Sequence, residues 1–418
     1  MKRIKSQLWF QIMVGLVLGV LVGWALGPDL RLVSEQTAAE AGAWLALPGN
    51  LFLTFIRFIV IPLVISSVIL GIAGSGDFAK VKKIGGAIVV YFVMTSAAAA
   101  TISITITSFF NPGSNGDKYD FEADPGALPD PHDIGSDIPG AIVNLFPNNF
   151  FEAMAGGELL HIVLASVIFG VALLAMKRSK STPLMQVLET VQGASLVIIE
   201  FIMKFAPIAV FGLIAQVMIT NGLDVIGDLG FYMMTFIIIL AAILVFYTAV
   251  LVGYSKRNPL EFARAIREPF VIAFSTSSSS ATMPITLKAA EENLKIDATV
   301  RRMVVPVGAT INLDGTAAYQ AIVIIFLAQI SGLQLDLTQI VLLVSLAVAA
   351  SIGAPGVPGG SLAILIGILP DFGIPLETFV LILAVDRPLD MARTAVNVTG
   401  DLVTCTVMQK FSGSKPAP

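Results

Sequence analysis

The sequence predicts an all-α membrane protein with eight transmembrane helices and two re-entrant helical hairpins arranged as inverted repeats. Three observations support this prediction. Of the 418 residues, 56% are hydrophobic and only 13% are charged, whereas soluble chains carry roughly 25% charged residues. Apolar stretches long enough to cross a bilayer recur along the chain. Two further apolar stretches are interrupted by serine, glycine and proline.

The composition excludes several classes of protein. The formal net charge of −4 leaves no basic face for nucleic acid. The single cysteine, Cys405, cannot form an intrachain disulfide or a cysteine-rich metal site. The two histidines, His132 and His161, are too few for a histidine-based metal centre. We therefore expect a chain embedded in membrane lipid, without a nucleic-acid partner.

Eight uninterrupted apolar stretches are the predicted transmembrane helices, because crossing a membrane takes about 20 apolar residues. They lie at 8–27, 43–73, 84–110, 159–176, 195–222, 225–253, 303–329 and 376–408. The first stretch is too long for a cleavable signal peptide and ends in Gly27-Pro28 without a small-residue cleavage pattern. We therefore interpret it as the first span. The segment 111–139, rich in glycine, proline and aspartate, is interpreted as an external loop.

Basic residues between the spans predict the orientation, since lysine and arginine concentrate on the cytoplasmic side. Basic clusters lie at 2–5, 80–83, 177–180 and 256–267, and acidic loops lie at 117–137 and 224–228. Their alternation predicts cytoplasmic N and C termini and a multi-pass location in the plasma (cell inner) membrane.

The stretch 270–287 breaks this alternation, because both of its ends are basic. Arg264 and Arg267 precede it, and Lys288 follows it. We therefore predict a re-entrant hairpin that returns to the cytoplasm, with its turn at the serine-rich segment 275–280. Taken alone, that segment could equally be a flexible turn.

The stretch 338–369 is the second predicted hairpin. It must enter and leave on the outer face if the helix 376–408 is to bring Lys410 and Lys415 inside. Its tip is the Gly353–Gly360 run, and such broken backbone is tolerated at membrane depth only inside protein or beside a water-filled cavity. Transporters hold substrate and ions between inverted repeats of this kind. A kinked helix or a loop is the alternative.

The last predicted helix contains ionisable residues, which are costly at membrane depth and mark function. At 100° per residue, six polar residues fall within an arc of about 100°. They are Asp386, Asp390, Arg393, Thr394, Asn397 and Asp401. We predict one polar stripe that faces the protein interior, with Arg387 at its edge. Structural ion pairs between helices are the alternative interpretation.

The residue types in this stripe predict the chemistry of a bound molecule. Arg393 can hold a carboxylate with two nitrogens, and Asp390 can accept from an ammonium group. Thr394 and Asn397 can hydrogen-bond a second carboxylate, so the stripe is complementary to an acidic amino acid. Asp401, one turn further along, is left for a cation.

The segment Gly308–Thr316 predicts a cation site. On a continuous helix Asn312 and Asp314 would point about 200° apart, so they share one site only where the helix unwinds. The glycines Gly308 and Gly315 permit this unwinding. An unwound segment with carboxylate, amide and hydroxyl oxygens suits a hard cation such as Na⁺.

Four motifs resemble the glutamate/aspartate transporter family of dicarboxylate/amino acid:cation symporters. They are the serine-rich segment 275–280, Asn312–Thr316, Ser351–Gly359 and Asp386–Asp401. The resemblance covers nearly the whole chain, and it points to a homologue of the prokaryotic sodium-coupled aspartate transporters in this family.

The resemblance implies a homotrimer in which each protomer has a static scaffold and a mobile transport domain. The scaffold would comprise 1–74 and 140–222, which hold the first, second, fourth and fifth helices. The transport domain would comprise the third helix at 75–110 and the segment 223–418, with the remaining helices and both hairpins. The external loop 111–139 lies outside both. The second hairpin would be the extracellular gate.

The resemblance also implies residue roles. The implied substrate-binding residues are Ser278, Ser279, Thr316, Val357, Asp390, Arg393, Thr394 and Asn397. The implied ligands of several Na⁺ ions are Phe92, Thr95, Ser96, Gly308, Thr310, Asn312, Asp314, Ser351, Ile352, Ala354, Asn397 and Asp401. Arg393 would bind the side-chain carboxylate of the substrate and Asp390 its amino group. The α-carboxylate would fall to Thr394 and Asn397.

Some positions depart from the family pattern. Ser277 and Met391 stand where some relatives have arginine, and Arg387 is the candidate substitute. Proton-coupled and dicarboxylate relatives tend to lack the acids that match Asp390 and Asp401. Both acids are present here, which favours a sodium-coupled amino acid carrier.

We expect a secondary-active, elevator-type symporter that takes up L-aspartate, or L-glutamate, driven by the Na⁺ gradient, and not an enzyme. A proton-coupled symporter of glutamate or a C4-dicarboxylate with the same fold is the alternative. A serine hydrolase would need a base, and His161 has no glycine-flanked serine motif to pair with. Arg57, Glu200 and Lys204 are further intramembrane charges to which the sequence assigns no role.

Overall fold

The structure is a computed structural model of the chain. It describes residues 8–28, 30, 32–73, 82–116, 119, 143, 146–157, 159–222, 224–333, 335–336, 339–342, 344–345, 349, 360–369 and 373–413. The tip of the second predicted hairpin and most of the predicted external loop lie outside this part of the chain. Four of the predicted site residues therefore lie outside the described residues, namely Ser351, Ile352, Ala354 and Val357.

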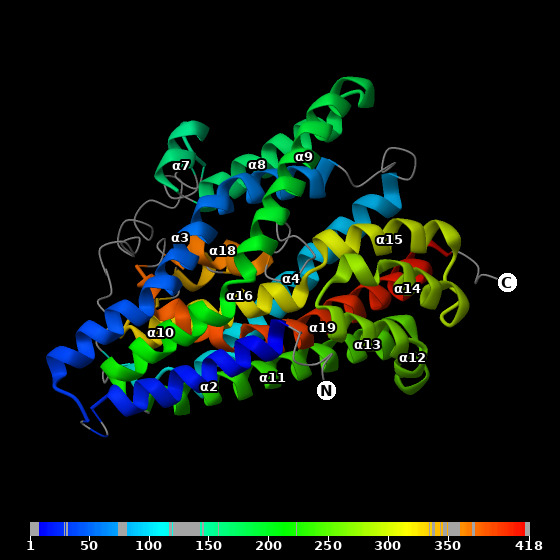
Figure 1. The fold of residues 1–418 in the computed structure, drawn as a ribbon. Helices are drawn as coiled ribbons and strands as arrows, with labels where there is room; N and C mark the ends of the chain where they lie inside the picture. The colour runs from blue at the N-terminus through cyan, green and yellow to red at the C-terminus, as the bar shows by residue number, and fades with distance from the viewer. Residues whose placement is uncertain are drawn as a thin grey trace.

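The described part of the chain is almost entirely helical (Figure 1). Its first half contains α2 (Leu8–Leu26), α3 (Glu35–Ala73), α4 (Lys82–Phe110), α7 (Phe150–Gly156), α8 (Leu159–Ala175), α9 (Arg178–Met203) and α10 (Ala206–Asn221). Its second half contains α11 (Asp224–Val250), η3 (Leu251–Ser255), α12 (Pro259–Ala265), α13 (Arg267–Thr276), α14 (Ser279–Glu292), α15 (Ala298–Ile311), α16 (Asp314–Ile330), α18 (Gly360–Ile368), η5 (Leu376–Thr378) and α19 (Phe379–Ser412).

Several of these helices are suited to a bilayer. Within the described residues, five helical stretches are long and apolar enough to cross a membrane: Glu35–Ala73, Gly86–Phe110, Arg178–Met203, Ile226–Ser255 and Ala298–Ile330. Three shorter apolar helices are Phe10–Leu26, His161–Ala175 and Ala206–Asn221. The helix α19 has 34 residues but also carries the charges of the polar stripe. A helical membrane protein is therefore confirmed in this coarse form.

The predicted span 195–222 differs from the structure. Two helices, α9 and α10, occupy this region and meet at Lys204 and Phe205. Pro207 lies in the first turn of α10 and has no backbone N–H with which to continue a helix from α9. The helix α9 also begins earlier than predicted, at Arg178. The prediction missed this start because the first half of α9 mixes polar and apolar residues and does not stand out as an apolar stretch.

The serine-rich segment 275–280 reverses the chain, as predicted. Ser277 and Ser278 separate α13 from α14. Ser277 has a left-handed backbone with φ of 52°, and Ser278 caps α14 by accepting a hydrogen bond from the Ala281 N–H at 3.1 Å. The two helices pack against each other, and both pack against α19.

The predicted span 303–329 is interrupted at Asn312 and Leu313, which separate α15 from α16. The ψ angle is 70° at Asn312 and 54° at Leu313, so neither residue is α-helical. The unwinding that the sequence predicts at this segment is present in the structure.

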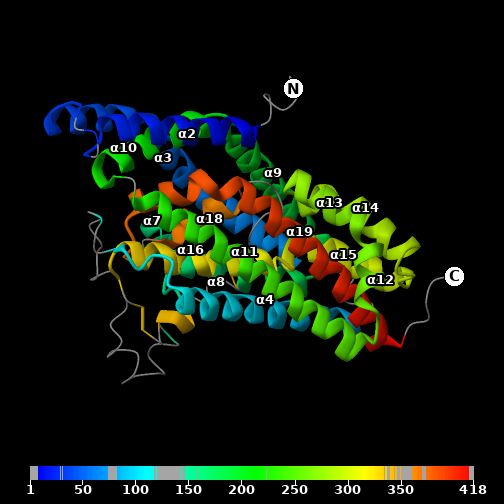
Figure 2. The ribbon, with the colours of Figure 1, turned by 90° about the horizontal axis from the view of Figure 1, so that it is seen from below.

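The helices pack extensively within two groups. In the first group, α3 packs against α8, α9 and α10, and α10 packs against α2. In the second group, α16 packs against α4, and α19 packs against α11, α13, α15 and α16. Figure 2 shows α2 and α10 along one edge of the molecule and α4 along the opposite edge, with α19 between them.

The helix α19 lies in the interior of its group. Its residues are buried over most of the segment between Phe379 and Gln409. The six residues of the predicted polar stripe are only 1% to 4% exposed, so the stripe faces the protein interior, as predicted. Cys405, on the same helix, is fully buried.

Candidate functional site

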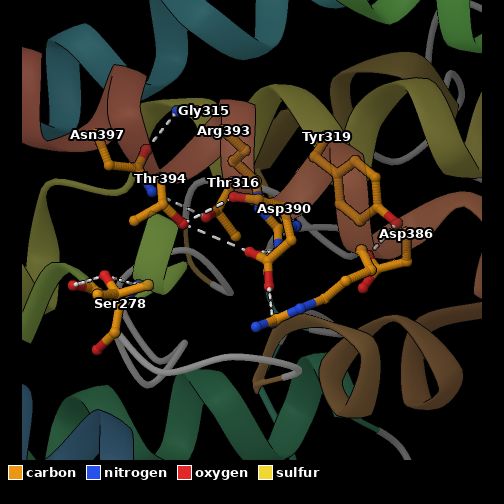
Figure 3. Close-up of polar contacts among 11 residues, drawn as sticks. Ser278, Gly315, Thr316, Tyr319, Asp386, Asp390, Arg393, Thr394 and Asn397 are labelled. Carbon is orange, nitrogen blue, oxygen red and sulfur yellow. Dashed lines mark hydrogen bonds and ion pairs between the residues drawn. The ribbon is translucent and has the colours of Figure 1, made fainter. Parts of the chain in front are cut away.

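The centre of the polar stripe is an ion pair between Asp390 and Arg393 of α19 (Figure 3). The Nη2 atom of Arg393 lies 2.6 Å from Asp390 Oδ1, because a spacing of three residues places both side chains on one face of the helix. The Thr394 hydroxyl donates to the Asp390 carbonyl oxygen at 2.8 Å. A carboxylate, a guanidinium and a hydroxyl thus lie within one turn.

One nitrogen of Arg393 remains available to a ligand. The guanidinium lies over the ring of Tyr319, 4.3 Å from its centroid, and the Tyr319 hydroxyl donates to Asp386 Oδ1 at 2.6 Å. The Nη1 atom of Arg393 is buried and has no hydrogen-bond partner in the described part of the chain. Because buried polar groups are normally hydrogen-bonded, this nitrogen is a ready donor to a bound carboxylate.

Arg387 approaches the other oxygen of Asp390. Its Nη1 atom lies 3.5 Å from Asp390 Oδ2, and its Nε atom is buried without a hydrogen-bond partner among the described residues. Asp390 therefore lies between two guanidinium groups. Because Asp386 completes the cluster with a second negative charge, the two acids balance the charges of Arg387 and Arg393.

Asn397 connects α19 to the start of α16. Its Oδ1 atom accepts from the Gly315 N–H at 2.8 Å, and its Nδ2 atom donates to Thr316 Oγ1 at 3.3 Å. A Cβ atom at Gly315 would lie 2.9 Å from the Arg393 carbonyl oxygen, so the two helices approach this closely only with glycine there. This contact brings Thr316, which the sequence predicts in the site, to the polar stripe.

The turn between α13 and α14 lies beside the same helix. Ala273 of α13 packs with Ala395 of α19. The implied ligands Ser278 and Ser279 are 6% and 3% exposed, and in Figure 3 Ser278 lies below the stripe. The Ser277 hydroxyl is buried and has no hydrogen-bond partner in the described part of the chain. This turn therefore supplies hydroxyl groups next to the polar stripe.

Asp314, the first residue of α16, is surrounded by hydroxyl groups. The Ser96 hydroxyl donates to its Oδ1 atom at 2.7 Å and the Thr95 hydroxyl at 3.2 Å. The Tyr247 hydroxyl donates to its Oδ2 atom at 2.7 Å. These donors come from α4 and α11, so three helices converge on one carboxylate.

Asp401 lies next to the break between α15 and α16. The Asn312 side-chain amide donates to its Oδ1 atom at 2.9 Å, and a Cβ atom at Gly308 would lie 2.2 Å from that oxygen. The other side-chain atom of Asn312, Oδ1, accepts from the Thr95 hydroxyl at 3.4 Å. Asn312 thus joins the surroundings of Asp401 to those of Asp314.

Neither of these two carboxylates has a cationic partner among the described residues. Asp314 and Asp401 are each 1% exposed, and neither forms an ion pair within the described residues. Those residues also include no group of three or more His, Cys, Asp or Glu side chains placed to hold one metal ion. A cation here would meet carboxylate, amide and hydroxyl oxygens, which hard cations prefer to nitrogen or sulfur.

Most of the predicted ligands that fall within the described residues lie around the polar stripe, Asp314 or Asp401. The Phe92 carbonyl oxygen accepts from the Thr95 hydroxyl at 3.1 Å, beside Asp314. Thr310 lies in the last turn of α15, where the structure describes its backbone. Arg57, Glu200 and Lys204, to which the sequence assigns no role, are exposed in this chain.

Two tyrosines belong to the site although the sequence did not single them out. Tyr247 contacts Asp314, and Tyr319 contacts both Asp386 and Arg393. Both are fully or almost fully buried. A buried tyrosine usually needs a hydrogen-bond partner for its hydroxyl. A tyrosine in an apolar predicted helix is therefore a sequence signal for a buried polar contact, but it does not identify the residue that is contacted.

Comparison with known proteins identifies the family. The model of the sodium:dicarboxylate symporter family matches residues 8–411. The chain belongs to this family. The resemblance to glutamate/aspartate transporters is thereby confirmed, and the symporter is an integral membrane transporter and not an enzyme.

Curated relatives align with the symporter over nearly its whole length. It is 32% identical to the proton/glutamate-aspartate symporter of Escherichia coli (strain K12), with 98% of this chain and 94% of the relative covered. It is 32% identical to the proton/sodium-glutamate symport protein of Bacillus subtilis (strain 168), with 99% and 94% covered. It is 30% identical to the C4-dicarboxylate transport protein of Laribacter hongkongensis (strain HLHK9), with 99% and 91% covered.

Proposed function

We propose that the symporter takes up L-aspartate, or its longer homologue L-glutamate. The inward Na⁺ gradient would drive this uptake. The observation that supports the proposal is the arrangement on α19. One buried face presents a guanidinium nitrogen of Arg393 without a partner among the described residues, the carboxylate of Asp390, and the polar groups of Thr394 and Asn397.

These groups complement an acidic amino acid. Arg393 would hold the side-chain carboxylate of the substrate, since a guanidinium binds a carboxylate through two nitrogens. Asp390 would accept hydrogen bonds from the ammonium group, for which a dicarboxylate without an amine has no counterpart. Thr394, Asn397 and the hydroxyls of Ser278 and Ser279 would hold the α-carboxylate.

The two buried acids support sodium coupling. An isolated carboxylate inside a protein is costly unless it is paired or neutralised. Na⁺ ions at Asp314 and Asp401 would remove that cost, and Asn312 would link the two ions to each other and to α16. Substrate and ions would then bind more tightly together than separately, a linkage that acts equally in both directions.

The two packing groups of helices suit an elevator mechanism. We assign the first group to a static scaffold, 1–74 and 140–222, and the second to a mobile transport domain, 75–110 and 223–418. In this proposal α13 and α14 form a re-entrant hairpin entered from the cytoplasm, and 338–369 forms its inverted counterpart. A homotrimer with cytoplasmic termini in the plasma membrane completes the assignment.

A proton-coupled symporter of glutamate or a C4-dicarboxylate is the second candidate. The observation that favours it is Arg387, which approaches Asp390 and keeps its Nε atom without a partner among the described residues. A second guanidinium beside Arg393 suits a molecule with two carboxylates. Protonation would also neutralise a buried acid such as Asp314 without Na⁺.

Uptake by reconstituted protein separates these candidates. Proteoliposomes with equal pH on both sides are diluted into Na⁺, K⁺ or choline buffer that contains labelled L-aspartate. We expect uptake in Na⁺ at least about tenfold above the other two, within the usual range of coupling energies. Asp401→Asn should remove this Na⁺ dependence, whereas Glu292→Gln, an exposed acid outside the site, should retain it.

Uptake that is unchanged when Na⁺ is replaced by K⁺ or choline, and that instead follows an imposed acidic outside pH, would refute sodium coupling. It would favour the proton-coupled candidate.

A further inference from the structure

A cavity of about 520 Å³ lies between α11, α12, α13 and α19, away from the polar stripe. Its volume is within the roughly 300–1,000 Å³ of pockets that hold small organic ligands. Its lining is mostly apolar and includes Leu244, Leu251, Leu260, Phe262, Phe270 and Val403. Leu260 is 70% exposed, so the apolar lining is reached from the outside of the molecule.

Two arginines complete the lining of this cavity. Arg264 lies in the last turn of α12, and Arg267 is the first residue of α13. Both side chains are exposed, and neither has an ion pair or hydrogen bond within the described residues. The neighbouring acids Glu261 and Glu268 do not line the cavity, so its charge is positive.

The cavity lies where a membrane-spanning helix ends. The apolar stretch Ile226–Ser255 is long enough to cross a bilayer, and the basic segment 256–267 follows it directly. If this stretch spans the bilayer, the apolar lining would lie at the end of the hydrocarbon region and the arginines at the level of the lipid headgroups. Basic pockets between transmembrane helices are typical binding sites for anionic headgroups.

We propose that this cavity binds an anionic phospholipid. One acyl chain would lie against the apolar lining, and the phosphate would accept hydrogen bonds from Arg264 and Arg267, whose planar guanidinium groups suit phosphate oxygens. A soluble anion would leave the apolar lining exposed. A neutral lipid would leave both guanidinium groups without a net negative partner.

Lipid binding to the purified, delipidated full-length protein tests the proposal. Native mass spectrometry titrates phosphatidylglycerol and phosphatidylcholine with identical acyl chains, and glycerol 3-phosphate serves as the headgroup without chains. We expect tighter binding of phosphatidylglycerol than of the other two probes. Arg264→Gln with Arg267→Gln should weaken phosphatidylglycerol roughly 10- to 30-fold, since each arginine near an anionic lipid contributes about a factor of five.

Two matched variants complete the test. Arg178→Gln with Lys180→Gln removes two exposed basic residues from the start of α9, outside the cavity, and should leave binding unchanged. Ala263→Trp fills the cavity with both arginines present and should also weaken phosphatidylglycerol. Melting temperatures of all variants check that each one is folded.

Several results would overturn the proposal. Equal binding of the two phospholipids would show that the cavity does not recognise the anionic headgroup. An equal loss of phosphatidylglycerol binding in the α9 variant would show only general attraction between charges. Binding of glycerol 3-phosphate as tight as that of phosphatidylglycerol would show a soluble-anion site. Full binding by folded Ala263→Trp would show that no acyl chain occupies the cavity.

Discussion

At the scale of single residues, the proposed function makes the choice of substrate depend on Asp390. It lies between Arg393 at 2.6 Å and Arg387 at 3.5 Å. An amino acid brings an ammonium group that can share this carboxylate. A dicarboxylate such as succinate brings only negative charge, which the two arginines attract and Asp390 repels.

Replacing Asp390 with serine should therefore separate the two classes of substrate. We expect L-aspartate affinity to fall about 10- to 150-fold, because a hydrogen bond to a charged group contributes about 1.5–3 kcal/mol. Succinate affinity should stay the same or rise, since both guanidinium groups lose their internal partner. Calorimetric titration with each ligand, with and without Na⁺, measures both values.

Glu292→Ser is the matched control, because Glu292 is an exposed acid whose ion pair with Lys288 is 3.9 Å long. It should change neither affinity. A parallel loss of aspartate and succinate binding in Asp390→Ser would contradict the assigned role of Asp390.

Sequence reasoning found the residues of the stripe but not all of their partners. The helical repeat alone places Asp390, Arg393 and Asn397 on one face of a helix, because that relation is local. Tyr319 and its partner Asp386 are separated by 67 positions in the chain. Such a contact depends on which helices pack together, and hydropathy carries no information on that.

At the scale of elements, the break between α15 and α16 gives the proposed cation site its shape. A continuous helix would send the side chains of Asn312 and Asp314 in opposite directions. With the break, Asn312 donates to Asp401 while Asp314 accepts from Ser96. The sequence predicted this break because two chemically related side chains were otherwise incompatible with one site.

Gly308→Ala tests the fit of this element. The new Cβ atom would lie 2.2 Å from Asp401 Oδ1, so the carboxylate must move. Overpacking of this kind costs about 1–3 kcal/mol, and we expect Na⁺ affinity to fall roughly 10- to 100-fold. The Na⁺ concentration that gives half-maximal aspartate binding measures this change.

Gly230→Ala is the matched control on α11, since a Cβ atom at Gly230 would have no described atom within 4 Å. It should leave the Na⁺ dependence unchanged. Wild-type Na⁺ affinity in Gly308→Ala would show that Asp401 does not bind a cation.

Helix ends were harder to predict than the presence of helices. The stretch 195–222 is mostly apolar and suggested one span, yet α9 ends at Met203 and α10 begins at Ala206. The separating residues, Lys204 and Phe205, are too few to lower an averaged hydropathy. A two-residue turn before a proline changes the direction of the backbone, and the apolar composition of the stretch does not reveal it.

At the scale of the whole molecule, a stripe of glycines fixes α2 against α10. A Cβ atom at Gly15 would lie 2.3 Å from the Pro207 carbonyl oxygen, and one at Gly19 would lie 2.6 Å from that of Phe211. Spaced four residues apart, these glycines let two helix backbones approach closely, as small residues do in membranes. The sequence predicted both helices but not their contact.

Gly19→Leu should force the two helices apart. We expect a lower melting temperature, by roughly 3–10 °C, because overpacking costs about 1–3 kcal/mol. Aspartate affinity should be unaffected in the folded fraction, since Gly19 faces Phe211 and Ile214 of α10 and not the residues of the polar stripe. Thermal unfolding of the detergent-solubilised protein, followed by intrinsic fluorescence, measures the shift.

Gly86→Leu is the control on α4, where a new Cβ atom would have no described atom within 4 Å. A smaller shift is expected there. Equal melting temperatures for Gly19→Leu and wild type would show that α2 and α10 can move apart without loss of folding stability.

The burial of Cys405 has a practical consequence for following movement. It is the single cysteine of the chain and is fully buried, so maleimide dyes find no native target on the folded molecule. Cysteines introduced at Val197 on α9 and Val245 on α11, which are 66% and 68% exposed, would accept paired spin labels. The separation of those labels would report whether one set of helices moves past the other, as the proposed mechanism requires, in a chain that keeps its native thiol.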